Sequence, residues 1–228
     1  MTAPKFDLTR RLFAETLGTA LLVSVVIGSG IMGEQLAGGN AAIALLGNTL
    51  ATGAALVVLI LIFAPISGAH FNPVVSLSFS LQRKLPWSEC LAYVVAQIIG
   101  AVAGALLAHA MFSLSLIEAS THIRTGAGVW TGEVVASFGL LATILGCLRT
   151  RPDAVPYAVG LFITAGYWFT SSTSFANPAV TIARSLTDTF SGIRPDDVLG
   201  FIAAQIVGCL LATGVFHWLW ANDSRHKK

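Results

Sequence analysis

Six apolar stretches, each about as long as a bilayer is thick, restrict the fold of this sequence more than any other feature. A helix needs about 20 apolar residues to cross a bilayer. The stretches cover residues 11–32, 41–64, 87–113, 129–149, 155–171 and 196–220. Only 11% of the 228 residues are charged, whereas an average soluble domain has about 25%. The sequence therefore predicts an all-α membrane protein with six transmembrane helices, of which the fifth is the shortest.

Two further segments are too apolar for ordinary loops and too short to cross a bilayer. They cover residues 67–79 and 174–183, and each contains an Asn-Pro step, at Asn72 and at Asn177. Apolar stretches of about 10–14 residues are candidates for re-entrant segments. Such backbone lies at membrane depth only where it is buried in protein or lines a wet cavity. We expect each segment to enter the membrane as irregular chain and to continue after its proline as a short half-helix.

The two halves of the chain carry the same polar residues in the same order: a glutamate, an Asn-Pro step and a glutamine. The sets are Glu15, Asn72-Pro73 and Gln97 in residues 1–128, and Glu133, Asn177-Pro178 and Gln205 in residues 129–228. Each half has three spans, and an odd number of spans gives the second half the opposite orientation. The order therefore predicts an inverted 3+3 repeat, with the functional site near the bilayer midplane where the halves meet.

The positions of lysine and arginine predict the orientation in the membrane. Six spans put both termini on one side. That side carries Lys5, Arg10, Arg11, Arg83, Lys84, Arg149, Arg151, Arg225, Lys227 and Lys228, and the other side carries Arg124, Arg184 and Arg194. Because cytoplasmic loops are richer in basic residues, we expect a multi-pass inner-membrane protein with both termini in the cytoplasm. The first re-entrant segment then enters from the cytoplasm and the second from outside.

The Asn-Pro steps suit the centre of a pore. Proline in the first turn of a helix loses no useful donor, and the asparagine side chain can cap the helix while its amide faces a pore. Two half-helices that meet at their N-termini place two partial positive charges there, which repels cations and interrupts a proton wire. A capped helix in an extramembrane loop is the alternative, but it leaves apolar neighbours in water. The residues expected at the pore centre are Asn72, Pro73, Val74, Asn177, Pro178 and Ala179.

Two glutamates lie inside predicted spans, where a carboxylate is costly. Glu15 and Glu133 have two interpretations: a proton relay, or buried acceptors for backbone N–H groups of the irregular segments. We favour loop support, because neither span offers a second acidic residue to receive a proton. Gln97 and Gln205 are interpreted as hydrogen-bond partners between helices.

These motifs resemble the major intrinsic protein family, the aquaporins and aquaglyceroporins, over nearly the whole chain. The most specific parts are Ser-Gly-Ala-His-Phe-Asn-Pro-Val at residues 67–74 and Asn177-Pro178-Ala179. The resemblance implies a passive channel for small uncharged solutes, a homotetramer in the lipid bilayer with one pore per subunit, and His70 beside the cytoplasmic half of the pore. We expect no cofactor, metal or nucleic-acid partner. The family usually has Asn-Pro-Ala in both loops, so Val74 is a departure that adds bulk beside the centre.

A larger departure concerns the outer constriction, the selectivity filter, which the family builds from four residues. The family has arginine directly after the second Asn-Pro-Ala, where this chain has Val180. Counting from Asn72 and Asn177 gives the other positions, and the predicted filter is Thr52, Ala165, Ser174 and Val180. It is small, mildly polar and uncharged. Arg184 lies one helical turn beyond Val180, on the same helix face, and could partly replace the missing arginine.

A wide filter without arginine is similar to that of the aquaporin subgroup associated with bacterial arsenic-resistance operons. This resemblance implies neutral metalloid hydroxides such as arsenous acid as solutes, with glycerol and water as further solutes. A water- or glycerol-selective channel without a metalloid role is an alternative. A proton-coupled secondary transporter is another, but it needs intramembrane acidic residues that face the substrate. No span carries a paired acid–base set or a Ser/His arrangement, so the sequence does not indicate an enzyme.

Overall fold

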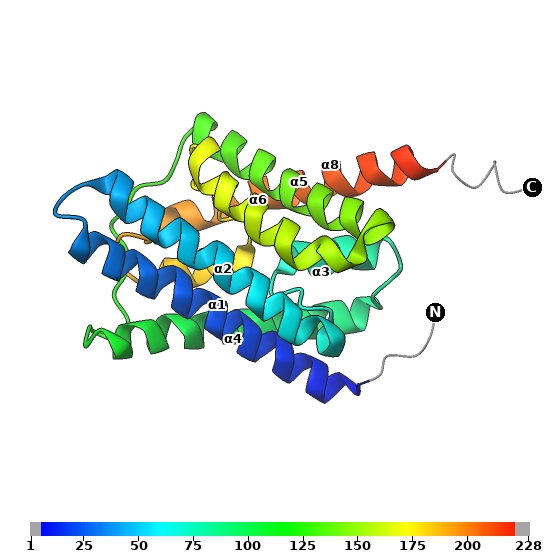
Figure 1. The fold of residues 1–228 in the computed structure, drawn as a ribbon, viewed down its shortest axis with the longest axis horizontal. Helices are drawn as coiled ribbons and strands as arrows, with labels where there is room; N and C mark the ends of the chain where they lie inside the picture. The colour runs from blue at the N-terminus through cyan, green and yellow to red at the C-terminus, as the bar shows by residue number, and fades with distance from the viewer. Residues whose placement is uncertain (1–5, 222–228) are drawn as a thin grey trace, which may run out of the picture.

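The structure, a computed structural model, describes residues 6–221. All regular elements in that range are helical, and Figure 1 shows the long helices side by side in one bundle. The elements are α1 (Leu8–Leu36), α2 (Ala41–Ser67), α3 (Pro73–Leu81), α4 (Trp87–Met111), α5 (Ala127–Thr150), η1 (Pro152–Ala154), α6 (Val155–Phe169), α7 (Pro178–Arg184), η2 (Pro195–Asp197) and α8 (Val198–Trp220).

Five of the long helices, α1, α2, α4, α5 and the helical stretch that ends with α8, are long and apolar enough to cross a membrane. The remaining long helix, α6, is the fifth span in chain order, has 15 residues and follows the 3₁₀ turn η1. At 1.5 Å per residue it extends over about 22 Å, which agrees with the expectation that the fifth span is the shortest. The predicted fold class, six long helices with two half-helices, is confirmed.

The two half-helices begin where the sequence predicts. Asn72 and Asn177 have extended backbone, with φ of −156° and −155°, and their side chains cap α3 and α7. Proline follows in the first turn of each helix, where its missing N–H leaves no bond unmade. α2 ends before Gly68, whose φ of 92° requires the left-handed conformation that glycine adopts freely. The irregular part of the first re-entrant segment starts there.

The packing of the helices repeats in the two halves. α1 packs against α2 and α4, and α5 packs against α6 and α8. Glycines allow a close approach at matching places, since a Cβ at Gly100 would lie 2.2 Å from the carbonyl oxygen of Thr16, and one at Gly208 would lie 2.4 Å from that of Val134. Small residues of this kind are typical of helix interfaces in membranes. The boundary between residues 128 and 129 stays a prediction, and α5 begins at Ala127.

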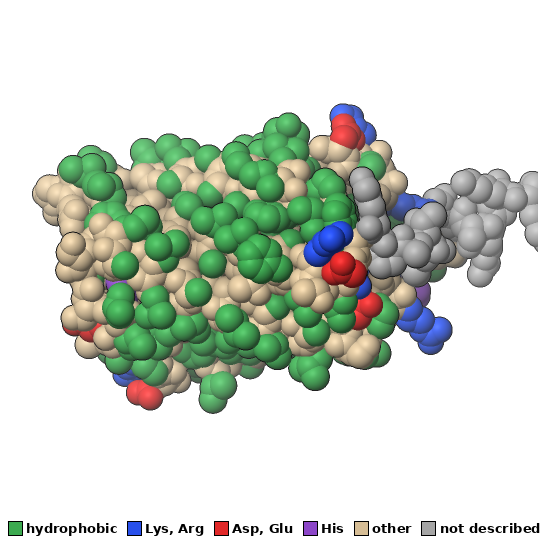
Figure 2. Space-filling model, turned by 90° about the horizontal axis from the view of Figure 1, so that it is seen from below, with side chains coloured by type: hydrophobic (Ala, Val, Ile, Leu, Met, Phe, Trp, Pro, Cys, Tyr) green, Lys and Arg blue, Asp and Glu red, His purple; other side chains and the backbone are tan. Residues whose placement is uncertain are grey.

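Charged side chains gather at the two ends of the molecule. Figure 2 shows a face whose middle carries hydrophobic and uncharged side chains, with Lys, Arg, Asp and Glu towards both ends. α1 begins and α8 ends at the same end of the bundle (Figure 1). This arrangement suits a molecule that crosses a bilayer, because the apolar middle matches the lipid tails. The orientation predicted from Lys5, Arg225, Lys227 and Lys228 rests partly on these residues, which lie outside the described range.

Candidate pore

A cavity of about 300 Å³ lies between the two halves. Its walls are mostly apolar faces of α1, α2, α5 and α6, for example at Leu56 and Ile144. Polar groups enter from the re-entrant segments, which contribute residues 68–72 from the first and Ser174 and Asn177 from the second. A mostly apolar cavity with few polar positions suits the transit of small molecules, because it gives them few places at which to bind tightly.

Glu15 holds the first re-entrant segment from behind. Its Oε1 accepts hydrogen bonds from the Ser67 hydroxyl at 2.6 Å and the His70 N–H at 3.0 Å. Its Oε2 accepts from the Phe71 N–H at 2.7 Å and from Nε2 of Gln97 at 2.8 Å. The carboxylate is fully buried, and these donors satisfy it where water cannot. The contacts are those of a loop support.

Glu133 has the same arrangement in the second half. Its two oxygens accept hydrogen bonds from the N–H groups of Phe175 and Ala176, both at 2.9 Å. Nε2 of Gln205 donates to Glu133 Oε2 at 2.6 Å and to Thr181 Oγ1 at 2.9 Å. In the first half Nε2 of Gln97 likewise donates to Ser76 Oγ at 3.0 Å. Each glutamine therefore joins its glutamate to its half-helix.

The two asparagines tie the halves together at the centre. Nδ2 of Asn72 donates to the carbonyl oxygen of Ala176 at 2.7 Å, and Nδ2 of Asn177 donates to that of Phe71 at 2.8 Å. Each amide carries two hydrogens, so one N–H of each side chain is used across the interface and the second remains for the cavity, which both residues line. The reciprocal bonds fix the direction in which the donors point.

The irregular backbone is strained at matching positions. Ala69 and Phe71 have φ of 51° and 49°, and Ser174 and Ala176 have φ of 52° and 48°. Residues other than glycine in this region cost of order 1–3 kcal/mol each. The bonds from the segment to the buried glutamates offset this cost, because without them the N–H groups would lie unpaired in the protein interior.

His70 and Val74 differ in their relation to the cavity. His70 lines it, with Nδ1 3.0 Å from Ser76 Oγ and its ring centre 4.5 Å from that of Phe79.

Val74 is 1% exposed and belongs to the hydrophobic core, and its carbonyl oxygen accepts a hydrogen bond from Cys209 Sγ. It is absent from the cavity wall. The prediction that Val74 adds bulk beside the pore centre is therefore wrong: its side chain packs into the core. Pro73, Pro178 and Ala179 are likewise buried outside the cavity lining.

Three of the four predicted filter residues line the cavity: Thr52, Ser174 and Val180. The prediction for Ala165 is wrong, because Ala165 is exposed on the outer face of α6. Tyr167 lines the cavity instead, and its hydroxyl lies 3.4 Å from Thr52 Oγ1. The count back from Asn177 assumed that the chain between the helix and the asparagine has a fixed path, and here it differs by two residues.

A signal for Tyr167 was present in the sequence. Val159, Ile163 and Tyr167 recur every four residues and share one helix face, and all three are buried and line the cavity. Ala165 lies two residues before Tyr167, about 200° around the helix. The periodicity of large residues on α6 therefore locates the pore-facing side better than a count from the Asn-Pro step.

The cavity wall includes Phe175, Val180 and Arg184, and we call the part of the wall around these three residues the arginine mouth. Arg184 Nε donates to the carbonyl oxygen of Ser191, and its guanidinium carbon lies 3.4 Å from the centre of the Phe175 ring. Arg124, from the connection between the halves, lies 5.2 Å from the same ring centre. Sequence reasoning did not single out Phe175 or Arg124 for this place.

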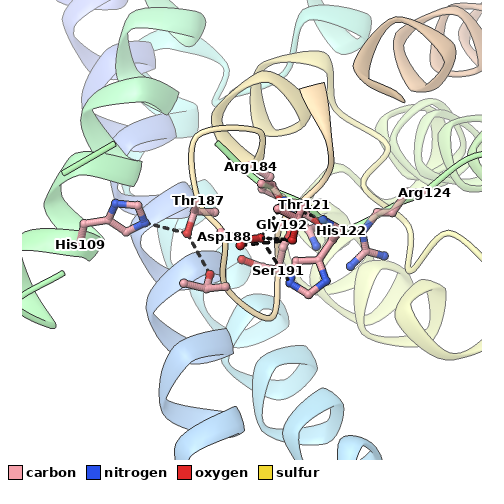
Figure 3. A network of polar contacts seen from close by, with 11 residues as sticks. His109, Thr121, His122, Arg124, Arg184, Thr187, Asp188, Ser191 and Gly192 are labelled. Carbon is pink, nitrogen blue, oxygen red and sulfur yellow. Dashed lines mark hydrogen bonds and ion pairs between the residues drawn. The ribbon is translucent and has the colours of Figure 1, made fainter. Parts of the chain in front are cut away.

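Polar contacts hold the loops of the arginine mouth together, as Figure 3 shows. Arg124 Nε donates to the Gly192 carbonyl oxygen at 2.7 Å, and Thr121 donates from its N–H to Asp188 at 2.8 Å. On α4, His109 Nε2 lies 2.7 Å from Thr187 Oγ1. The connection between the halves is thus tied to the chain that follows α7.

Comparisons with known proteins agree with this architecture. The family model described as Major intrinsic protein matches residues 2–153. The chain is 57% identical over 215 residues to "Aquaglyceroporin AqpS" of Rhizobium meliloti (strain 1021), covering 94% of this chain and 92% of the relative. It is 31% identical to "Aquaporin NIP2-3" of Zea mays, covering 93% of this chain and 70% of that protein.

A solved structure has the same fold. The X-ray structure of the aquaglyceroporin from Plasmodium falciparum superposes with a TM-score of 0.72, covers 94% of this chain and 96% of that chain, and is 21% identical in sequence. The family match covers more than half of the 228 residues and the bacterial relative covers nearly all of them. By its sequence and its helix arrangement, the chain belongs to the major intrinsic protein family.

Proposed function

We propose that the chain is a passive channel for small uncharged solutes and that it conducts neutral metalloid hydroxides such as arsenous acid, together with glycerol and water. Asn72 and Asn177 form the pore centre, His70 lines the wall beside it, and Glu15 and Glu133 with their glutamine partners support the loops. The helix N-termini behind the two asparagines carry partial positive charge and keep protons and cations from passing the centre.

The observation that carries the solute proposal is the side chain at position 180. A valine lines the cavity there, so no guanidinium narrows the pore directly after the second Asn-Pro-Ala. Thr52 and Ser174 are small and polar, and Tyr167 adds one ring whose hydroxyl lies near Thr52. Such a filter has room and hydroxyl partners for a solute with several hydroxyl groups, which water alone does not require. The filter we propose is Thr52, Tyr167, Ser174 and Val180.

Both arsenous acid and a polyol fit this description, because both are neutral and present several hydroxyl groups. The name of the bacterial relative, an aquaglyceroporin, supports glycerol among the solutes. The metalloid proposal depends on the absence of arginine at position 180. A channel for water or glycerol without a metalloid role is the second candidate, and it is favoured by Tyr167, whose ring narrows the filter relative to an alanine.

Assembly and orientation complete the proposal. We propose a homotetramer, supported by the family resemblance. We also propose an inner-membrane location with both termini in the cytoplasm, supported by basic residues on one side: Arg83, Lys84 and Arg151 in connections and Arg149 in the last turn of α5. The mass of the purified protein in detergent, measured by light scattering, tests the tetramer: a mass of one chain would contradict it.

Stopped-flow light scattering on proteoliposomes tests the solute. Wild-type protein and a Val180→Arg variant are compared for water, glycerol and arsenous acid. We expect fast flux of both solutes in the wild type and a loss of at least about tenfold in the variant, because a guanidinium is much bulkier than the valine side chain that lines the cavity there, and a tenfold change needs only about 1.4 kcal/mol. Glycerol flux without arsenous acid flux would reject the metalloid role. Water flux alone, equal in both proteins, would reject the filter. Uphill accumulation driven by a proton gradient would indicate a transporter instead.

A further inference from the structure

The last residue of α7, Arg184, lies in an unusual place for a charged side chain. It is 2% exposed, yet it belongs to the wall of the cavity, beside Phe175 and Val180. Val180 and Arg184 are four residues apart on one helix and therefore share a face. The guanidinium thus lies one helical turn beyond Val180, the position at which the filter has no charged side chain.

Arg184 has no ion-pair partner within residues 6–221. No carboxylate of the described chain forms an ion pair with it, and its Nε bonds to a neutral acceptor, the Ser191 carbonyl oxygen. Its Nη1 is buried without a hydrogen-bond partner. A buried charge that lacks a partner is costly to the fold. The side chain therefore needs an explanation other than stability.

The carboxylates near the arginine mouth are engaged elsewhere. Asp188 accepts hydrogen bonds from the N–H and hydroxyl of Thr121. Asp197 accepts from the Arg124 N–H at 2.8 Å and pairs with Arg194 at 2.9 Å. Arg124 itself has its guanidinium against the Phe175 ring. Two guanidiniums thus share one aromatic ring at this mouth, which keeps both in place through cation–π attraction and adds their positive charges.

The inverted repeat shows that the fold does not need a charge here. Arg184 follows Asn177 by seven residues, and the residue that follows Asn72 by seven is Phe79, which also lines the cavity. Phe175 likewise corresponds to His70, and the two pairs occupy equivalent positions: His70 against Phe79 at 4.5 Å between ring centres, and Phe175 against the Arg184 guanidinium at 3.4 Å. The same scaffold accepts a neutral aromatic residue in one half and arginine in the other.

We propose that Arg184, held against Phe175 and supported by the charge of Arg124, is the barrier to cations at this mouth and takes over the charge that position 180 lacks. This inference rests on the proposed channel function and names a second barrier, at the mouth, that adds to the repulsion of cations by the helix N-termini at the centre. A fixed positive charge on a pore wall repels cations and leaves neutral solutes unaffected. The competing explanation is a purely structural bond between α7 and Ser191.

Flux measurements on proteoliposomes separate these explanations. Glycerol flux and the leak of sodium ions and protons are measured in one preparation of wild-type protein, Arg184→Gln, Arg184→Lys and the control Arg151→Gln. Arg151 lies on the exposed surface at the end of α5. We expect Arg184→Gln to raise the ratio of cation leak to glycerol flux roughly tenfold, since removing a unit charge near the path lowers the barrier to cations. Arg184→Lys and Arg151→Gln should match the wild type.

A second variant at position 184 keeps the test decisive. If Arg184→Gln conducts no glycerol, Arg184→Phe takes its place, since the first half already folds with phenylalanine at the equivalent position. A variant that conducts glycerol without a cation leak overturns the inference and leaves the proposed function standing, as does a wild type that conducts glycerol and already leaks. A wild type that conducts no neutral solute overturns both.

Discussion

The two re-entrant segments share a backbone design and differ in the side chains that they present to the cavity. In each, a buried glutamate holds two N–H groups, a glutamine joins it to the half-helix, and an asparagine reaches across to the other segment. We call these glutamates, glutamines and asparagines the frame. Outside the frame, the first segment presents His70 and Phe79 to the cavity, and the second presents Phe175 and Arg184. The frame determines where the pore lies, and the side chains outside the frame are free to determine what passes.

The two groups of residues should respond differently to substitution. A change in a frame residue leaves buried donors unpaired and affects folding, whereas a change at a cavity-lining position outside the frame affects flux. As a member of the major intrinsic protein family, the chain is a membrane channel for small solutes and not an enzyme. The prediction from the sequence on this point is confirmed.

The largest effect is expected from the two frame glutamates. Glu15→Gln and Glu133→Gln should each lower the free energy of unfolding by roughly 3 kcal/mol. The NH₂ group of glutamine replaces one carboxylate oxygen, so it faces buried N–H groups and leaves at least one of them without an acceptor. Unfolding in mixed detergent micelles, followed by circular dichroism, measures both. Because the two segments have the same arrangement of hydrogen bonds, we expect equal losses. A variant that retains full stability would mean that the glutamate does not support the segment in that half.

A glycine that lacks a glycine counterpart provides the second comparison. Gly104 and Ala212 lie at equivalent distances after Gln97 and Gln205, and a Cβ at Gly104 would lie 2.3 Å from the Ala20 carbonyl oxygen. Gly104→Ala should therefore cost about 2 kcal/mol of stability through overpacking, although the second half already has alanine there. The same unfolding assay applies. An unaffected Gly104→Ala protein would mean that α1 and α4 can move apart as easily as α5 and α8.

Val74 tests the separation between core and cavity. Val74→Ala should destabilise by about 1–2 kcal/mol, since it removes two buried methyl groups, and should leave glycerol flux unchanged because the side chain does not line the cavity. The variant also makes both motifs Asn-Pro-Ala. Stopped-flow flux at equal protein content is the readout. A changed solute preference would show that the residue after the proline reaches the pore after all.

The smallest effect is expected at Asp188. Hydrogen bonds from the N–H and the hydroxyl of Thr121 lower the pKa of Asp188 from its ordinary value of 3.8. A carboxyl whose pKa falls on folding contributes stability above its ordinary pKa and loses it as the pH drops through the folded value. Thr121→Val should thus lower the melting temperature slightly at pH 7, and the difference from wild type should fade below about pH 4. A difference that grows in acid would contradict this assignment.

The frame could be predicted from the sequence because its residues are polar, lie in apolar surroundings and occur twice in the same order. Glu15, Asn72 and Gln97 each have a counterpart, and no count of intervening residues is needed to recognise them. The cavity wall was harder to predict. Ala165 was placed there by counting through an irregular segment, and the helix phase of Tyr167 was the better guide.

The arginine mouth depends on contacts that no local pattern encodes. Arg124 reaches Phe175 from a connection 51 residues earlier in the chain, a proximity that only the folded loops create. Val74 shows the reverse difficulty: it follows the motif at the pore centre but points into the core. Which side of a short half-helix faces the cavity follows from the packing of both halves.

The crossed asparagine bonds also set an order of events during synthesis. Asn72 donates to a carbonyl oxygen that is 104 residues further along the chain. At a translation rate of about 5–20 residues per second, the first re-entrant segment exists for roughly 5–20 s before its acceptor has been made. During that time the Asn72 amide lacks its acceptor from the second half, while the nascent first half lies in the membrane or at its surface. The pore centre is therefore a late event of biogenesis, completed only when the second half arrives.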